Sequence, residues 1–352
     1  MSVTIKEFGK TRAGQIVHSF TLYQDNGTFC TLISYGGAVQ SLLMPDRSGR
    51  FQDIVLGYDD MAGYEGLNNP YHGALIGRHG NRIEDACFEI DGRTYHLARN
   101  DGRNHLHGGL RGFDKQIWQG EPVNAPEGPA VCFRYRSPDG DEGYPGNLDV
   151  EATYVLTADQ ALIIRYRAVS DQKTVINLTN HSYFNLAGQG SGTILAHQVQ
   201  IEADEFTAIN QECNPTGEII PVAGTALDFR QMKPIGRDIG SGELQIINGL
   251  GYDHNFILRD KSPGRKACAA VYEPKFGRVM TVETTSPGVQ LYTGNFMKPD
   301  TGKEGVRYDY RNGFCLETQY FPNSLKHKNF PSPIFAAGEV FSQETVYRFS
   351  AR

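Results

Sequence analysis

Two side chains of this sequence have the residue types that proton transfer requires. Glu317 lies in the strand-like run CLETQYFPNS, so apolar and aromatic neighbours surround its carboxylate. His181 lies between Asn180 and Ser182 in the run NLTNHSYFNL. Burial would raise the pKa of the carboxyl group, and hydrogen bonds would fix the tautomer of the imidazole. The two residues could act as a base and an acid, although a salt-bridged strand glutamate and a satisfied core histidine fit the local sequence as well.

Two more polar clusters lie in the first third of the chain. IGRHGNRI places Asn81 and Arg82 beside two glycines, where the backbone can approach a ligand closely and the guanidinium can bind vicinal hydroxyls. NHLHGG contains His105 and His107, which would share a face of a strand. This spacing can ligate a metal, but a third ligand close by is missing. A histidine that hydrogen-bonds beside the Gly-Gly turn is the favoured interpretation.

A further cluster, GYDHNF, places Asp253 and His254 before an apolar strand. Neighbours on a strand point to opposite faces, so these two side chains should not pair as in a catalytic triad. Asp253 is expected to accept hydrogen bonds from sugar hydroxyls or to lie in a turn. The sequence has no phosphate-binding loop, dinucleotide fingerprint, nucleophile elbow, HExxH motif or paired CxxC. Acid–base chemistry that uses His and Glu, with polar and aromatic residues to hold a ligand, is what remains.

The elements that must position these groups are expected to be strands. Residues 161–169 (ALIIRYRAV) interleave β-branched residues with arginines, which predicts a strand with one wet face. Asp91-Gly92 between CFEI and TYHL predicts a hairpin. Helical turns are expected only at 59–64 and 234–239. With no linker or repeat in the sequence, residues 1–352 are predicted to form one all-β domain, a sandwich of two large sheets.

Composition excludes several classes of protein. The chain has 352 residues, 39% of them hydrophobic, and a net charge of −6. This is not the basic footprint of a nucleic-acid-binding protein. No signal peptide and no apolar run of 18 residues is present, so we expect a cytoplasmic protein with no membrane partner. Six dispersed cysteines are expected to be reduced, buried thiols.

Taken together, the clusters resemble the galactose mutarotase (aldose 1-epimerase) family in order, spacing and wording, over essentially the whole chain. Two departures are Gly80, where the family commonly has Ala, and Ala337, where Pro is common. The resemblance implies a β-supersandwich of large antiparallel sheets with few short helices, and no cofactor. The matching segments are GRHGNRI, NHLHGG, GFDKQIW, SPDGDEGYPGNL, NLTNHSYFNLAG, GYDHNF, PGVQLYTGNF and LETQYFPNS.

The resemblance also implies roles for single residues. Glu317 would be the general base and His181 the general acid. The chemistry agrees, because mutarotation removes a proton from the C1 hydroxyl, delivers one to the ring oxygen, and reverses both after rotation about C1–C2. Glu317 would start ionised and His181 protonated. The residues implied to bind the sugar are Asn81, Arg82, His107, Tyr183, Asp253 and Gln290.

The expected partner is a free aldose, galactose or glucose, and the chain is expected to be a monomer or a homodimer. Two alternatives stay open. A glycosidase could use Asp253 and Glu317 as its carboxylate pair. A non-catalytic sugar-binding module could share the same fold, because fold does not determine function.

Overall fold

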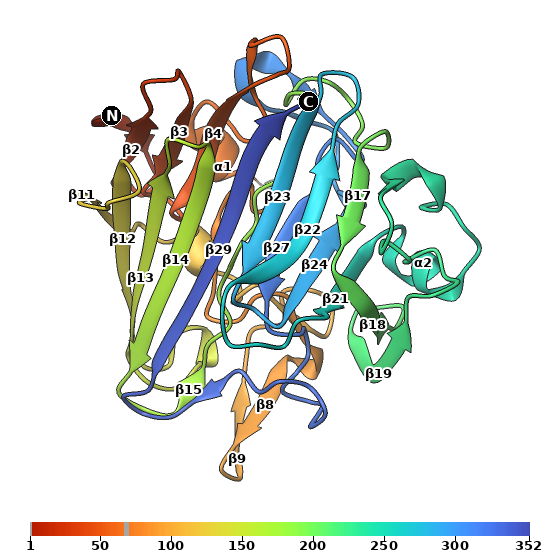
Figure 1. The fold of residues 1–352 in the computed structure, drawn as a ribbon. Helices are drawn as coiled ribbons and strands as arrows, with labels where there is room; N and C mark the ends of the chain where they lie inside the picture. Colours follow the sequence, from red (N-terminus) through yellow and green to blue (C-terminus); the bar gives the residue numbers. More distant parts are fainter. Residues whose placement is uncertain (1, 67–69) are drawn as a thin grey trace.

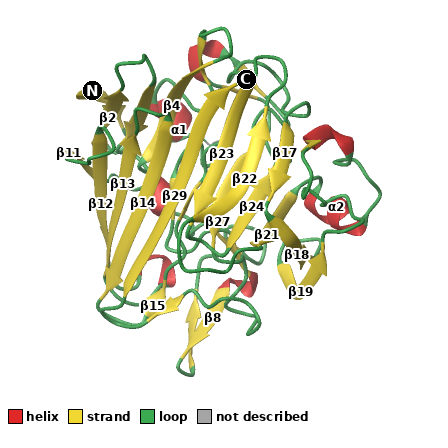
Figure 2. Ribbon diagram, viewed as in Figure 1, coloured by secondary structure: helices red, strands yellow, loops and turns green. Residues whose placement is uncertain are grey.

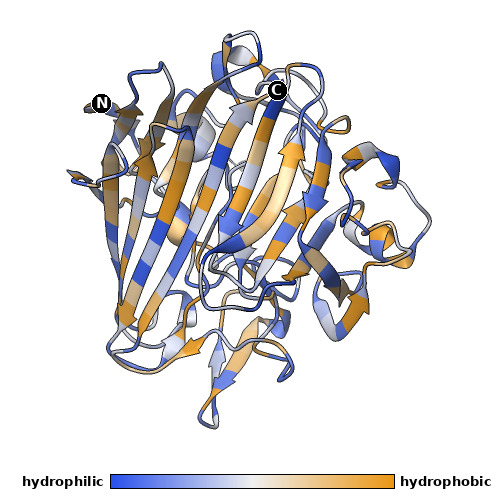
Figure 3. Ribbon diagram, viewed as in Figure 1, coloured by the Kyte–Doolittle hydropathy of each residue, from blue (hydrophilic) through white to orange (hydrophobic). Residues whose placement is uncertain are grey.

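The computed structural model describes residues 2–66 and 70–352, and its regular structure is almost all β (Figure 2). The prediction of an all-β fold of large antiparallel sheets is confirmed. Along the strands, hydrophobic and hydrophilic residues alternate in many places (Figure 3), as expected where one face of a sheet packs on a core and the other meets solvent. The strand β14 (Ala161–Ser170) shows this directly, with Arg167 exposed between buried Tyr166 and Ala168.

A nine-stranded antiparallel sheet forms the front of the molecule in Figure 1. The last strand of the chain, β29, lies in the middle of this sheet between β14 and β23. The C-terminal segment therefore joins the two halves of the sheet. In order, the sheet contains β11 (Gln119–Val123), β12 (Ala130–Ser137), β13 (Leu148–Leu156), β14, β29 (Val340–Ala351), β23 (Arg278–Thr284), β22 (Lys266–Tyr272), β17 (Gln198–Ile201) and β20 (Lys233–Pro234).

Two five-stranded sheets lie against the large one, and a single hydrophobic cluster contains residues of all three, including Leu32, Phe133 and Leu316. The first is a simple meander of β1 (Ser2–Lys10), β2 (Ile16–Tyr23), β3 (Phe29–Ile33), β4 (Ala38–Pro45) and β5 (Phe51–Asp53). The second has the order β19 (Pro215–Pro221), β18 (Ala203–Ile209), β21 (Asp253–Leu258), β24 (Gly288–Tyr292) and β27 (Cys315–Gln319).

Five short two-stranded ladders complete the β structure. The predicted hairpin at Asp91-Gly92 is confirmed, with both residues at positive φ as a tight turn requires. The ladders are β6 (Leu75–Ile76) with β16 (Thr179–Asn180), β7 (Arg82–Ile83) with β10 (His105–Leu106), β8 (Cys87–Ile90) with β9 (Arg93–His96), β15 (Thr174–Val175) with β28 (Ile334–Phe335), and β25 (Asp300–Thr301) with β26 (Arg307–Tyr308).

The described residues contain two short α-helices, α1 (Met61–Tyr64) and α2 (Leu244–Gly249). The helical turn predicted at 59–64 is α1, and the one predicted at 234–239 contains the 3-10 turn Ile235–Arg237. The sequence did not predict α2, which has only six residues and no side chain capping its first turn. No helix in the described part of the chain is long and apolar enough to cross a membrane.

Candidate active site

The second five-stranded sheet presents one polar face and one apolar face. Residues that pair directly across strands lie on the same face, and the register pairs Gln290 with Glu317, and Tyr292 with both Cys315 and Asp253. The residues that alternate with them on β24 and β27, such as Leu291 and Leu316, belong to the hydrophobic core. Strand alternation therefore places Glu317 and Asp253 on the same face, opposite the core.

A cavity of about 270 Å³ opens over this polar face. Seven of the eight residues predicted for the site line it, namely Asn81, Arg82, His107, His181, Tyr183, Asp253 and Glu317. Gln290 does not line the cavity. Its Nε2 donates a hydrogen bond of 2.7 Å to Asp253 Oδ1, so it supports a residue that does.

Sequence reasoning missed several residues of the cavity wall. Tyr292 and Phe296 lie inside the segment PGVQLYTGNF, whose aromatic residues could have been considered. Tyr71 and Asp101 come from loops, and nothing in their local sequence points to a site. Asp101 reaches the cavity because its carboxylate accepts a hydrogen bond of 2.7 Å from Arg82 Nε. Pro70 and Leu106 complete the wall.

Glu317 and His181 face each other on the cavity floor. The distance from His181 Nε2 to Glu317 Oε1 is 3.7 Å, and both side chains are buried. Glu317 Oε2 has no hydrogen-bond partner among the described residues. The other ring nitrogen, His181 Nδ1, lies 3.6 Å from the sulfur of Cys315. One nitrogen of the imidazole and one oxygen of the carboxylate are thus left for a ligand.

The neighbours of His181 hold its backbone rather than its ring. Asn180 Oδ1 accepts hydrogen bonds from the hydroxyl and the N–H of Ser182. The backbone N–H of His181 donates to the carbonyl of Ala74, and its carbonyl accepts from Gly73. These polar residues therefore fix the turn that carries the imidazole into the cavity.

Burial determines where the proton of this pair lies. Burial, followed by the negative charge of Asp253, raises the pKa of Glu317 well above its ordinary value, while Arg82 acts to lower it. Burial lowers the pKa of His181 to about 4. Both shifts place a shared proton on Glu317. Burial thus disfavours both charges, whereas the expected reaction starts from an ionised Glu317 and a protonated His181.

His107 lines the cavity, but it does not share a strand face with His105 as the sequence predicted. His105 and His107 do not share a face, because β10 ends at Leu106 and His107 has a φ of 52°. His105 turns away, and its ring contacts the carbonyl of Ala98 and the hydroxyl of Tyr144. His107 Nδ1 accepts a hydrogen bond of 3.1 Å from the N–H of Asn81. The neutral ring must therefore carry its proton on Nε2, which makes it a donor.

His107, His181 and Glu317 each offer a potential ligand atom, and these atoms lie within 4.8 Å of one another. Such a set can hold a metal ion by composition. The tautomer of His107 opposes this, because Nδ1 already accepts the N–H of Asn81 and only a protonated Nε2 is left. Hydrogen bonds to a polar ligand suit the three groups better.

Arg82 positions two further carboxylates of the cavity, those of Asp253 and Asp101. Its Nη1 lies 3.5 Å from Asp253 Oδ2, and its Nε donates to Asp101. Asn81 Oδ1 accepts from the backbone N–H of Arg82. The guanidinium therefore lies between two carboxylates and holds both at the cavity wall, where they can accept hydrogen bonds from hydroxyl groups.

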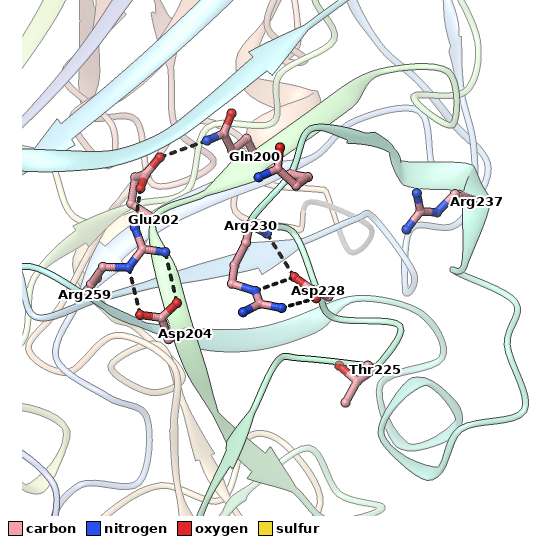
Figure 4. A pocket seen from close by; sticks show the side chains of 10 residues that line it. Gln200, Glu202, Asp204, Thr225, Asp228, Arg230, Arg237 and Arg259 are labelled. Carbon is pink, nitrogen blue, oxygen red and sulfur yellow. Dashed lines mark hydrogen bonds and ion pairs between the residues drawn. The ribbon is translucent and has the colours of Figure 1, made fainter.

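A broader hollow of about 970 Å³ lies elsewhere, along β17 and β18 (Figure 4). Most of its charged side chains are paired with one another. Arg259 binds Asp204 and Glu202, and Arg230 binds Asp228 in a two-pronged arrangement. It contains none of the predicted site residues. The smaller cavity, with a buried carboxylate and imidazole on its floor, is the better candidate.

The fold and this cavity define a class of protein, a β-sandwich enzyme with a buried acid–base pair in a small polar pocket. Comparisons with known proteins agree. The family model described as aldose 1-epimerase matches residues 18–348. The galactose mutarotase of Sus scrofa is 44% identical over 99% of both chains, and the aldose 1-epimerase of Escherichia coli (strain K12) is 36% identical over 96% of both. The solved galactose 1-epimerase from Lactobacillus acidophilus NCFM superposes with a TM-score of 0.86 at 26% identity, covering 100% of this chain and 99% of its own.

The chain therefore belongs to the aldose 1-epimerase family. It is an isomerase acting on carbohydrates, and its reaction is the interconversion of the α and β anomers of aldoses. The resemblance stated from the sequence and the fold expected from it are both confirmed.

Proposed function

We propose that this enzyme anomerises free galactose and glucose, with Glu317 as the general base and His181 as the general acid. The observation that carries the assignment is the 3.7 Å separation of His181 Nε2 and Glu317 Oε1 on the floor of a cavity of sugar size. At this distance one group can reach the C1 hydroxyl while the other reaches the ring oxygen of the same sugar.

Ring opening needs two proton transfers. Glu317 takes the proton of the C1 hydroxyl while the bond from C1 to the ring oxygen breaks, and His181 Nε2 gives a proton to that oxygen. The products are the open-chain aldehyde, a protonated Glu317 and a neutral His181. After rotation about C1–C2, the ring oxygen attacks the other face of the carbonyl. Glu317 returns its proton to the carbonyl oxygen, His181 recovers its own, and the enzyme is regenerated.

The pKa shifts determine how this route begins. Burial favours protonated Glu317 with neutral His181. That is the state of the pair while the open-chain aldehyde is bound. Ring opening therefore begins with the transfer of the shared proton from Glu317 to His181, which Arg82 assists because it acts to lower the pKa of Glu317.

The other cavity residues bind hydroxyl groups and leave C1 free to rotate. His107 offers its Nε2–H, and Arg82 supplies a charged donor. Asp253 is an acceptor held in place by Gln290, and Asn81 fixes His107 by its backbone N–H. Tyr183 is buried beside His181, with 5.0 Å between their ring centroids, and forms part of the apolar wall.

Polarimetry of freshly dissolved α-D-galactose and α-D-glucose tests the proposal. The wild type should accelerate the change in optical rotation, and Glu317→Gln and His181→Asn should each lower kcat by roughly 10²- to 10⁴-fold. Matched controls are Glu89→Gln and His96→Asn, which change exposed residues of the β8–β9 hairpin and should keep full activity. If either cavity variant kept wild-type kcat, the assignment of the pair would be wrong.

A further inference from the structure

The two ring nitrogens of His181 have different neighbours. Nε2 lies 3.7 Å from Glu317 Oε1 on the cavity floor, and Nδ1 lies 3.6 Å from the sulfur of Cys315. Among the described residues, this sulfur is the only side-chain group within hydrogen-bond reach of Nδ1. Cys315 is fully buried (0% exposed), so the sulfur is shielded from solvent. The proton state of Nδ1 therefore depends on this contact.

One strand brings both groups to the ring. Cys315 and Glu317 are two residues apart on β27, so their side chains lie on the same face of the strand. The register pairs Cys315 with Tyr292 and Glu317 with Gln290 on β24, which fixes the two side chains relative to each other. The imidazole of His181 lies against both, so its two nitrogens meet a sulfur and a carboxyl oxygen whose spacing the strand sets.

The thiol of Cys315 is neutral. Burial raises its pKa well above the ordinary value, and the charges of Glu317 and Asp253 raise it further. A neutral thiol is a weak donor and a weak acceptor of hydrogen bonds. It can therefore donate to a bare Nδ1 or accept from a protonated one, and the chemistry at Nε2 determines which of the two occurs.

The position of the shared proton selects the tautomer of His181. Burial keeps this proton on Glu317 and leaves the imidazole neutral. The carboxyl proton can pass to Nε2 only if that nitrogen has a free lone pair, so the single ring proton has to lie on Nδ1. The backbone carbonyl of His181 acts in the same direction. It raises the pKa of the ring, it can only accept, and Nδ1 is the ring nitrogen nearer to the backbone.

This tautomer is kept through the whole reaction. The proton of Glu317 moves to Nε2, which gives a carboxylate and an imidazolium with a proton on each nitrogen. Nε2 then gives its proton to the ring oxygen of the sugar while Glu317 takes the proton of the C1 hydroxyl. The bond between Nδ1 and its hydrogen is never broken, so the acceptor of that hydrogen is needed at every step.

We propose that Cys315 is a positioning residue of the reaction: its sulfur accepts the Nδ1 proton of His181 and so leaves Nε2 free to take the proton of Glu317. This inference rests on the proposed function, because it uses the roles assigned to the pair. A neutral sulfur also holds the charge of the imidazolium less firmly than a carboxylate would at the same place. His181 therefore passes its proton readily to the ring oxygen.

The tautomer can be measured by NMR. Long-range proton–nitrogen correlation spectra of the enzyme with isotope-labelled histidine, recorded at neutral pH without sugar, distinguish protonated from bare ring nitrogens. The signals of His181 are those missing in His181→Asn. We expect a protonated Nδ1 and a bare Nε2 in the wild type, and a population with the proton on Nε2 in Cys315→Ala. A wild type with its ring proton on Nε2 would overturn the proposal, because the sulfur would then be a donor.

Kinetics separate the hydrogen bond from simple packing. Cys315→Ala should lower kcat by about tenfold, the effect of one buried hydrogen bond, and leave KM within about twofold, because no contact to the sugar is lost. Cys315→Ser keeps an acceptor and should hold kcat within about threefold of the wild type. Cys268→Ala is the matched control. Its thiol is equally buried (0%), lies in the hydrophobic core and does not line the cavity, so kcat should be unchanged.

The remaining outcomes count against the proposal and are distinguishable. If Cys315→Ala keeps the kcat of the wild type, or if Cys315→Ser is as slow as Cys315→Ala, the sulfur only fills space beside the ring, while the proposed function stands. If the wild type accelerates the anomerisation of neither galactose nor glucose, the proposed function fails and this inference fails with it. The wild-type spectrum tests the proposal even where a variant does not fold.

Discussion

At the scale of single residues, the charges around Glu317 and His181 influence the protonation of this pair. Among the described residues that line the cavity are three carboxylates, Glu317, Asp253 and Asp101, and one guanidinium, that of Arg82. The charge of Asp253 opposes ionisation of Glu317, and Arg82 favours it. On the proposed route the pair is active only while it holds one proton, so the alkaline limit of the reaction is the loss of that proton from Glu317.

Asp253→Asn should therefore move the alkaline limit of kcat to lower pH. Removing the negative charge lowers the pKa of Glu317, and the pair loses its proton sooner as the pH rises. The amide oxygen of Asn can still accept the hydrogen bond from Gln290, so the local structure is retained. Polarimetry at saturating sugar from pH 6 to 10, corrected for the spontaneous reaction, measures the limit. A shift to higher pH would contradict this account, and Glu89→Gln should show no shift.

At the scale of elements, the β7–β10 ladder and the turn after it carry both Arg82 and His107 into the cavity. The turn depends on Gly108, which has a φ of 86°. A Cβ atom at this position would lie 1.8 Å from the carbonyl oxygen of Gly77. Only glycine fits, because the clash would involve backbone rather than a movable side chain.

Gly108→Ala should therefore destabilise the enzyme by about 3 kcal/mol or more and displace His107, so that kcat/KM falls together with stability. Gly92→Ala provides the comparison, since it also has positive φ (79°) but nothing lies within 4 Å of its Cβ position. It should cost only about 1 kcal/mol of backbone strain and leave kcat/KM unchanged. Urea unfolding and polarimetry measure the two effects. Similar losses in both variants would show that strain alone, and not the contact with Gly77, is responsible.

The elements also show what the sequence could and could not predict. Alternation along a strand and turn residues are local signals, so β14 and the Asp91-Gly92 hairpin were predictable. Tyr71 and Asp101 were not, because they belong to loops and only the folded chain brings them to the cavity. The i, i+2 spacing of His105 and His107 led to the wrong prediction of a shared strand face, because the strand ends between them. The protonation of Glu317 and His181, the proposed catalytic pair, could not be predicted either, since it depends on how deeply the fold buries both groups.

At the scale of the whole molecule, the large core buries an unusual number of titratable groups. Seven of the ten histidines have pKa values lowered by burial. The pKa is lowered to about 3 for His79 and His197 and to about 4 for His105 and His181, and for His107 it lies well below 6.5. The other two are His72 and His254, both lowered to about 3.

The lowered pKa values of these histidines predict that the free energy of unfolding falls steeply in mild acid. Between about pH 4 and 6.5 each is neutral in the folded chain and protonated in the unfolded chain, so the unfolded state binds more protons. Their contribution is present above pH 6.5 and is lost as the pH falls, at up to about 1.4 kcal/mol per pH unit for each histidine. Glu317 and Asp114 act in the opposite direction, because burial raises their pKa values in the folded chain, but they are two groups against seven histidines. The enzyme should therefore unfold cooperatively between about pH 6 and pH 4.

Urea unfolding at intervals of half a pH unit from 7.5 to 4.5 measures this slope. His79→Gln should reduce it by about one proton, because the amide does not titrate, whereas His96→Gln, at an exposed position, should leave it unchanged. Circular dichroism at pH 4.5 should show that the native sheets are lost and that they return at pH 7. A free energy of unfolding that stayed constant between pH 6.5 and 4.5 would mean that these rings do not have to charge when the chain unfolds, and the burial argument that also places the catalytic proton on Glu317 would fail with it.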